Sequence, residues 1–96
     1  MQIHIDTADD NERKRIRRFL QFLLSGQRSE IDSLQLIIEP VRDALGTRLN
    51  RCQIRSTLKL GQQIEVEEIQ SSLDLAVTRA LERCMRTIHR KLRVTS

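Results

Sequence analysis

The chain has 96 residues, 31% of them charged, and a formal net charge of +4, so it fits one small domain, residues 1–96, with a single core. Its two Phe residues and its lack of Trp and Tyr predict a core of Leu, Ile and Val and nearly exclude stacking on nucleobases. Because no run of about 18 apolar residues and no secretory leader pattern is found, no membrane association is expected, and the cytoplasm, with reduced thiols, is the expected location.

Residues 2–6 alternate apolar and polar side chains, a pattern that predicts a half-buried strand. Asp and Asn residues follow as helix caps, and a helix is expected over about residues 9 to 25. The apolar stripe predicted to face inward contains Ile16, Phe19, Leu20, Leu23 and Leu24. Gly26 and the polar residues up to Ser33 are expected to end this helix.

A second strand is predicted over residues 34–39, where β-favouring apolar residues are almost continuous. Pro40 is expected to end this strand because proline has no N–H for the ladder. Residues 41–47, VRDALGT, are expected to form a loop or a loose hairpin connection. From Leu49 onward the alternation returns and predicts a third strand, the clearest in the chain.

Gly61 marks a turn before a fourth alternating segment, QIEVE. Side chains that oppose each other across a ladder share a face, so Leu58 is expected to oppose Val66 across a three-residue loop of residues 61–63. In this register Lys59 opposes Glu65 on the solvent side.

Helical spacing of apolar residues from Ile69 to Ile88 predicts a last helix, with Glu67 and Glu68 near its positive end. The order is therefore β-α-β-β-β-α, an α+β fold with a four-stranded mixed sheet and both helices packed on one face. The crossover through the first helix predicts that the first two strands are parallel. The opposite sheet face is expected to be open to water, with the charged residues Arg51, Arg55, Lys59, Glu65 and Glu67.

The sequence has no pattern that supports catalysis. His4 and His89 lack a supporting nucleophile motif, and no Gly-rich phosphate loop is present. Cys52 and Cys84 lack the spacing of a metal site and are expected to be small buried hydrophobic residues. The chain is therefore predicted not to be an enzyme and to use no metal, no cofactor and no small-molecule substrate.

The basic residues are arranged in two groups, one on each predicted helix. In the last helix the arginines that recur on one face are Arg79, Arg83, Arg86, Arg90 and Arg93. Such like charges at i,i+4 cost about 0.2–0.5 kcal/mol each, and only Glu82 lies near them to offset the repulsion. A solvated charged face without a partner is the commonest reading of a charge run.

The second basic group lies in the first half of the first helix, and the topology places both helices on one side of the sheet. A groove between or across the helices is therefore expected to present both groups to one polyanion, since guanidinium groups match phosphates. The expected nucleic-acid contacts are Arg79, Arg83, Arg86 and Arg90, with Lys14, Arg17 and Arg18 as a second line. Because Phe19 is expected to face inward, recognition of the backbone and shape of structured RNA is expected.

A pattern over nearly the whole chain resembles the short members of the hibernation-promoting factor and ribosome-associated inhibitor family of bacteria. The residues that carry it are MQIHI at the start, Ile16, Arg17 and Phe19 in the first helix, and SSLDLAVTRALERCMR, in which Leu73, Asp74, Arg79 and Arg86 match the family. The sequence departs from the family at Leu23, Gly26, Gln70 and Glu82, where basic residues or Tyr are usual.

The resemblance implies a fold similar to double-stranded-RNA-binding domains. It also implies binding to the small ribosomal subunit and its rRNA, in the channel used by messenger and transfer RNA, with inhibition of translation in idle or stressed cells. The alternative is a protein-interaction or homodimerisation module of the same fold that does not bind the ribosome, with the homodimer formed through an exposed strand edge. Phosphate contacts weaken steeply with salt, whereas a dimer built on apolar edges is largely indifferent to it.

Overall fold

The computed structural model describes residues 1–25 and 30–95, with side chains described as far as Lys91 in the last helix. Its elements, in chain order, are β1 (Gln2–Asp6), α1 (Asp10–Leu23), β2 (Ile31–Arg42), β3 (Arg48–Leu58), β4 (Gln63–Gln70) and α2 (Leu73–Thr95). Gly26, which was expected to end the first helix, and the side chain of Arg93 lie outside the described residues. Over the residues described, neither α1 nor α2 combines the length and the apolar character needed to cross a membrane.

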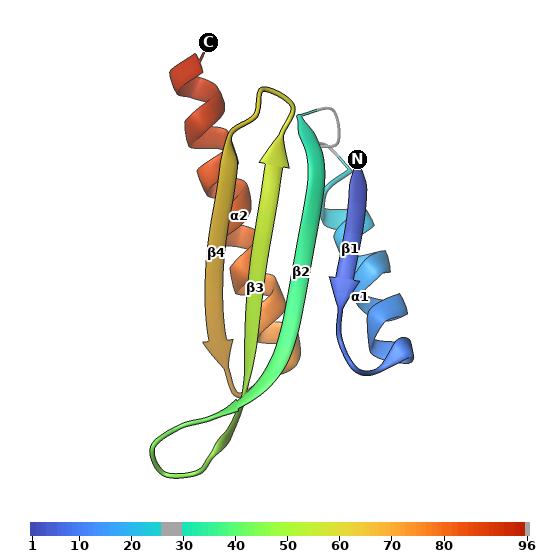
Figure 1. Ribbon diagram of the computed structural model, residues 1–96, viewed down its shortest axis with the longest axis vertical. Coiled ribbons are helices and arrows are strands. Elements are labelled where there is room, and N and C mark those ends of the chain that lie inside the picture. Colours follow the sequence, from blue (N-terminus) through green and yellow to red (C-terminus); the bar gives the residue numbers. More distant parts are fainter. Residues whose placement is uncertain (26–29, 96) are drawn as a thin grey trace.

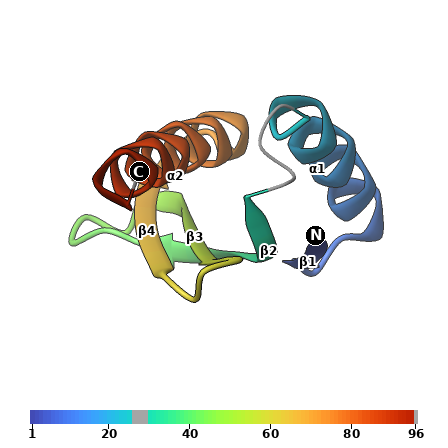
Figure 2. The same cartoon turned by 90° about the horizontal axis from the view of Figure 1, so that it is seen from above.

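The four strands form one sheet in the order β1-β2-β3-β4. β1 runs parallel to β2, as the helical crossover predicts, and the other neighbouring pairs are antiparallel. Figure 2 shows both helices on the same face of this sheet, where α1 packs on β1 and α2 packs on β3 and β4. The predicted α+β fold, with a mixed sheet covered on one side, is confirmed.

The core lies between the helices and the sheet and is aliphatic. Ile16 and Leu20 of α1 and Leu24, which follows the helix as its C-cap, lie in this core. These three residues are spaced by four along the chain, and each is at most 4% exposed. Phe19 and Leu23 were predicted to face inward, and this was wrong: they are 36% and 39% exposed. Because α1 lies at the edge of the sheet, over β1, one row of its side chains is enough to meet the core, and the neighbouring row is left outside it.

β2 is longer than predicted, and its hairpin with β3 extends well past the other strands (Figure 1). Pro40 does not end β2, which continues to Arg42, and the predicted hairpin connection is residues 43–47. Asp43 N–H donates to Thr47 O at 3.1 Å, and bonded pairs alternate along antiparallel strands, so the nitrogen of Pro40 points away from β3. β1 pairs with β2 only as far as Ile37, so this nitrogen faces an open edge, where proline is tolerated.

The register of the β3–β4 hairpin also differs from the prediction. Gly61 N–H donates to Leu58 O at 2.9 Å, and Gly61 has a φ of 94°. This geometry is typical of a three-residue loop that ends with a residue in the left-handed region, so the loop is residues 59–61 and not 61–63. Glu65 consequently opposes Arg55. The predicted partner of Glu65 was Lys59, four positions later, which lies in the turn. The shift is an even number of residues, so the predicted inward and outward faces are kept.

α2 begins later than the spacing of apolar residues suggested. Ile69 belongs to β4 and is 45% exposed, and Glu67 and Glu68 are strand residues rather than neighbours of the first helical turn. Ser72 Oγ accepts a hydrogen bond from Leu75 N–H at 3.3 Å and caps the helix. The ladder with β3 reaches Gln70 and therefore decides the boundary.

Candidate nucleic-acid interface

The α2 stripe, which we define as Arg79, Arg83, Arg86 and Arg90, lies on the side of α2 next to the free edge of β4. Arg83 shows this orientation, because its Nη1 is 2.9 Å from Glu68 Oε2 and donates to the carbonyl oxygen of Glu67 at 2.6 Å. Residues at i, i+3, i+4 and i+7 share a face, so the whole stripe is turned toward this edge.

Arg83 is partly neutralised by these contacts. Its hydrogen bond, together with one that Gln70 donates at 2.9 Å, holds the pKa of the Glu68 carboxyl below its ordinary value. Glu68 is therefore ionised and paired under neutral conditions. One of the four predicted phosphate contacts in α2 thus has a structural role at the edge of the sheet.

The remaining residues of the α2 stripe have a different environment. Arg79, Arg86 and Arg90 are exposed, and none of them takes part in a hydrogen bond or ion pair with the residues that the structure describes. At 1.5 Å per residue they span about 16 Å of helix, which is long enough to meet several phosphates of one nucleic-acid strand.

The predicted contacts on α1 divide in the same way. Arg17 is half-buried, and its Nη1 donates to the carbonyl oxygen of Ile3 in β1 at 3.3 Å. Lys14 and Arg18 are exposed and make no ion pair or hydrogen bond within the described ranges. Two of these three positive charges are therefore available to a partner.

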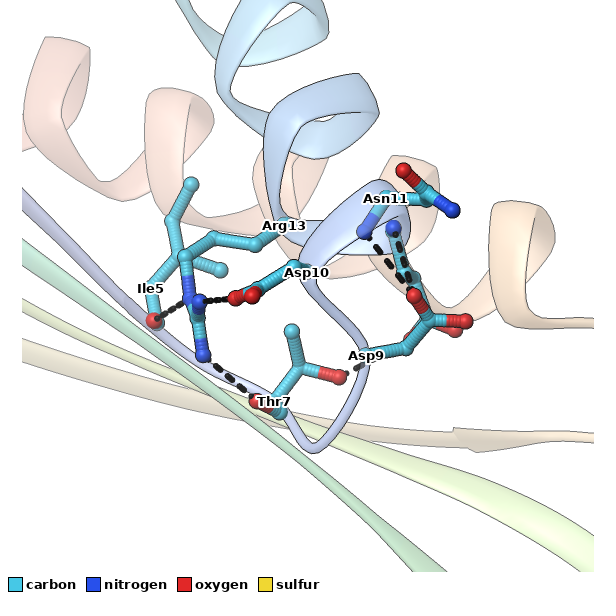
Figure 3. A network of polar contacts seen from close by, with 7 residues as sticks. Ile5, Thr7, Asp9, Asp10, Asn11 and Arg13 are labelled. Carbon is cyan, nitrogen blue, oxygen red and sulfur yellow. Dashed lines mark hydrogen bonds and ion pairs between the residues drawn. The ribbon is translucent and has the colours of Figure 1, made fainter.

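Arg13, which the sequence did not single out as a contact, fixes the start of α1 against β1 (Figure 3). The Asp9 side chain caps the helix, and one turn later Arg13 donates to Ile5 O at 3.3 Å and to Thr7 O at 2.9 Å. Arg13 also pairs with Asp10. Arg13 and Arg17 thus bind carbonyl oxygens along β1, the edge strand of the sheet. Their positions beside the buried row of α1 are the sequence signal for this role.

A cleft of about 240 Å³ lies between the two helices. Its walls are formed by Arg15, Ile16, Phe19, Asp74, Val77 and Thr78. Arg15 Nη1 and Asp74 Oδ1 are 2.9 Å apart and join α1 to α2. None of the seven predicted nucleic-acid contacts lines this cleft, so the groove expected to combine both basic groups is not seen. The α2 stripe lies toward the β4 edge instead.

The open face of the sheet is balanced in charge. Arg51 pairs with Glu39 at 3.1 Å and with Glu67 at 3.0 Å, and Arg55 pairs with Glu65 at 2.7 Å. These cross-strand pairs neutralise the arginines in the middle of β3. The positive charges without partners that were predicted to meet phosphate therefore lie on the helical side of the molecule.

Metal-ligating side chains and thiols are the groups in this chain that could support other chemistry. In the described part of the chain, no three His, Cys, Asp or Glu side chains gather so that they could hold a metal ion. Burial raises the pKa of Cys52 to about 12 and that of Cys84 to about 11, so both thiols are protonated near neutral pH and are poor nucleophiles.

Comparison with known proteins does not assign a function. A scan against protein-family models and a search of curated proteins both give no significant match to the chain. The features that bear on function are therefore the fold, the distribution of unpaired charge and the sequence resemblance given above.

Proposed function

We propose that this protein is a noncatalytic RNA-binding protein of the ribosome-hibernation type. In this proposal it occupies the small-subunit channel used by messenger and transfer RNA, contacts rRNA there, and inhibits translation in idle or stressed cells. The sequence resemblance supports the ribosome as the partner, and the charge distribution supports RNA. Such a function requires the cytoplasm as its location.

The observation that carries the proposal is the set of unpaired arginines in α2. Arg79, Arg86 and Arg90 repel one another, and none of them forms a hydrogen bond or ion pair with the described residues around them, although Arg79 helps to lower the pKa of Glu68. By contrast, Arg51 and Arg55 on the sheet each have a carboxylate partner. A polyanion removes the repulsion in α2 and takes bidentate hydrogen bonds from the guanidinium groups.

The structure also refines the expected contacts. Arg79, Arg86 and Arg90 are proposed as the main phosphate contacts, with Lys14 and Arg18 as the second line. Arg83 and Arg17, which also appear among the sequence-based contacts, hold β4 and β1 and contribute mainly their charge to the field.

The alternative of a homodimer through a strand edge has less support. Carbonyl oxygens of both edge strands already accept hydrogen bonds from arginine: Glu67 in β4 from Arg83, and Ile3 in β1 from Arg17. A second chain that added to either edge would have to displace these donors.

Reversing Arg86 and Arg90 to Glu tests the proposal by cosedimentation with purified small subunits at low and moderate salt. The wild type is expected to cosediment, and Arg86→Glu/Arg90→Glu is expected to bind at least about tenfold more weakly, with a salt slope that is smaller by about one per lost contact. Unchanged binding of this variant would overturn the proposal.

The matched control is Arg48→Glu/Lys59→Glu, which makes the same change in net charge at exposed positions near the hairpin ends. This control is expected to retain most of its binding, because neither residue belongs to the α2 stripe. An equal loss in both variants would reject the α2 stripe as the contact site and would leave only a general effect of charge.

A further inference from the structure

Both phenylalanines of the chain are exposed, and both lie on α1. Phe22 is 77% exposed and Phe19 is 36% exposed, in a chain with no Trp or Tyr. An aromatic ring is among the largest apolar groups that a core can bury. The core uses neither of them, so their place on the surface calls for another explanation.

The two rings share this face of α1 with basic residues. Residues spaced by four form rows along a helix, and the two adjacent rows are Lys14, Arg18 and Phe22, and Arg15, Phe19 and Leu23. In each row the cations come first and the apolar side chains follow. Neighbours in a row have Cβ atoms about 5–6 Å apart, so one nucleotide-sized ligand can touch both kinds of side chain.

We propose that this face of α1 binds unpaired RNA nucleotides, with bases stacked on Phe22 and Phe19 and adjoining phosphates held by Arg18 and Lys14. The inference rests on the proposed RNA-binding function and extends it from backbone recognition to the stacking of bases. It also replaces the expectation that stacking has no part, because that expectation required Phe19 to be buried.

Charge complementarity identifies the occupant. Lys14 and Arg18 have no partner among residues 1–25 and 30–91. Arg18, one turn before Phe22, therefore favours an anion beside the exposed ring, and Lys14 favours a second anion one turn further away. Single-stranded nucleic acid combines phosphates with flat bases, and the sites that bind it combine cations with aromatic rings. An apolar protein segment would cover Phe22 but would leave both cations without a counter-charge.

Phe19 extends the aromatic surface toward the second helix. Its ring forms part of the wall of the 240 Å³ cleft, with Ile16 and Val77. Arg15 stands at the same cleft, held there by Asp74. An RNA strand whose first base stacks on Phe22 therefore meets a second apolar surface, that of Phe19, next to Phe22.

Binding is measured with three labelled probes: an oligouridylate, a strand of the same length with abasic sugars, and a blunt RNA duplex. The wild type is expected to bind oligouridylate at least about 5- to 150-fold more tightly than the abasic strand, the range that stacking of one base on an aromatic side chain gives. In Phe22→Ala this preference is expected to fall at least about fivefold, leaving at most the contribution of Phe19, while binding of the duplex is unchanged.

Leu60→Ala is the matched control, because Leu60 is an apolar residue of the turn between β3 and β4, outside α1, and is 75% exposed, nearly as exposed as Phe22. It is expected to bind every probe like the wild type. Phe22→Trp is expected to retain the preference, and since the chain has no other Trp, quenching of its emission by oligouridylate, but not by the abasic strand, reports stacking directly.

The possible results separate this inference from the proposed function. If oligouridylate and the abasic strand bind equally, or if Phe22→Ala binds like the wild type, the stacking site is rejected, even when small subunits still bind. If small subunits do not bind but the preference for bases depends on Phe22, the inference stands and the ribosome is rejected. A homodimer that sedimentation equilibrium detects and that Phe22→Ala dissociates would show that a second copy covers this face, and would overturn the inference.

Discussion

Arg83 connects α2 to the free edge of the sheet, with its Nη1 2.9 Å from Glu68 Oε2 and 2.6 Å from the carbonyl oxygen of Glu67. Arg86, less than one turn further along the same stripe, is exposed and makes no such contact with the described part of the chain. One row of arginines thus contains a residue used by the fold and residues that remain open to a partner.

Replacing Arg83 by Gln is expected to lower the free energy of unfolding by about 0.5–1.5 kcal/mol, since a hydrogen bond from a charged donor is lost and the side chain is half-exposed. Arg86→Gln removes the same charge and is expected to change stability by less than about 0.5 kcal/mol. Urea unfolding measures both values. Equal effects would show that the contact of Arg83 with β4 does not stabilise the fold.

The Glu68 carboxyl is expected to contribute to the pH dependence of stability. Arg83 and Gln70 hold its pKa below the ordinary value of 4.5, so the unfolded chain binds this proton more readily than the folded chain does. The contribution is therefore present above the unfolded-state pKa and is lost as the pH falls through the lower, folded-state pKa. Urea unfolding at a series of acidic pH values should show a smaller loss of stability in Glu68→Gln than in the wild type. Parallel curves for the two proteins would contradict the assignment.

The element order could be predicted because it depends on local patterns. Alternation in β1 and β3 and helical periodicity around Ile16 are properties of short segments, and the crossover through a helix fixes the parallel pair. The end of β2 is not a local property. Pro40 is tolerated because β1 stops pairing with β2 at Ile37 and leaves that edge open, which no segment of sequence shows by itself. The hairpin register likewise depended on which loop position needs the positive φ of Gly61.

The sequence predicted which positively charged residues lie on one face of α2, but not which of them are paired with other residues of the chain. The sequence identifies arginines at helical spacing, yet Arg83 and Arg86 look alike until β4 is placed beside α2. The contact of Arg83 with Glu68 joins residues 15 apart in sequence, and that of Arg17 with Ile3 joins residues 14 apart. The exposure of Phe19 was missed for a similar reason, because the width of the buried stripe depends on how far α1 lies from the centre of the sheet.

The two cysteines are expected to be unreactive in the folded protein. Cys52 and Cys84 are 0% exposed, and burial raises their pKa to about 12 and about 11. At about pH 8, near the usual thiol pKa, a thiol reagent such as DTNB should modify neither residue until the chain is unfolded. Ser71→Cys, at an exposed position, provides a reactive thiol for comparison. Modification of the native wild type at the rate of that variant would contradict the burial of both thiols.

Two arginines of α1 donate hydrogen bonds to carbonyl oxygens along the free edge of β1. Arg17 donates to Ile3 O at 3.3 Å, and Arg13 donates to Ile5 O at 3.3 Å and Thr7 O at 2.9 Å. Alternate carbonyl groups of a strand point to the same side, so these arginines occupy successive acceptors on the edge that β2 leaves free. An edge without such donors is a template for pairing with another chain.

Replacing both arginines by Met keeps their aliphatic stems and removes the donors. Arg13→Met/Arg17→Met is expected to be less stable by about 1–3 kcal/mol and to self-associate as its concentration rises. Lys14→Met/Arg18→Met makes the same charge change on the same helix but at exposed positions, and it should remain monomeric and close to the wild type in stability. Urea unfolding and sedimentation velocity compare the two variants. If the first variant is as stable and as monomeric as the second, the arginines do not protect this edge, and their positive charge must be explained by an external partner instead.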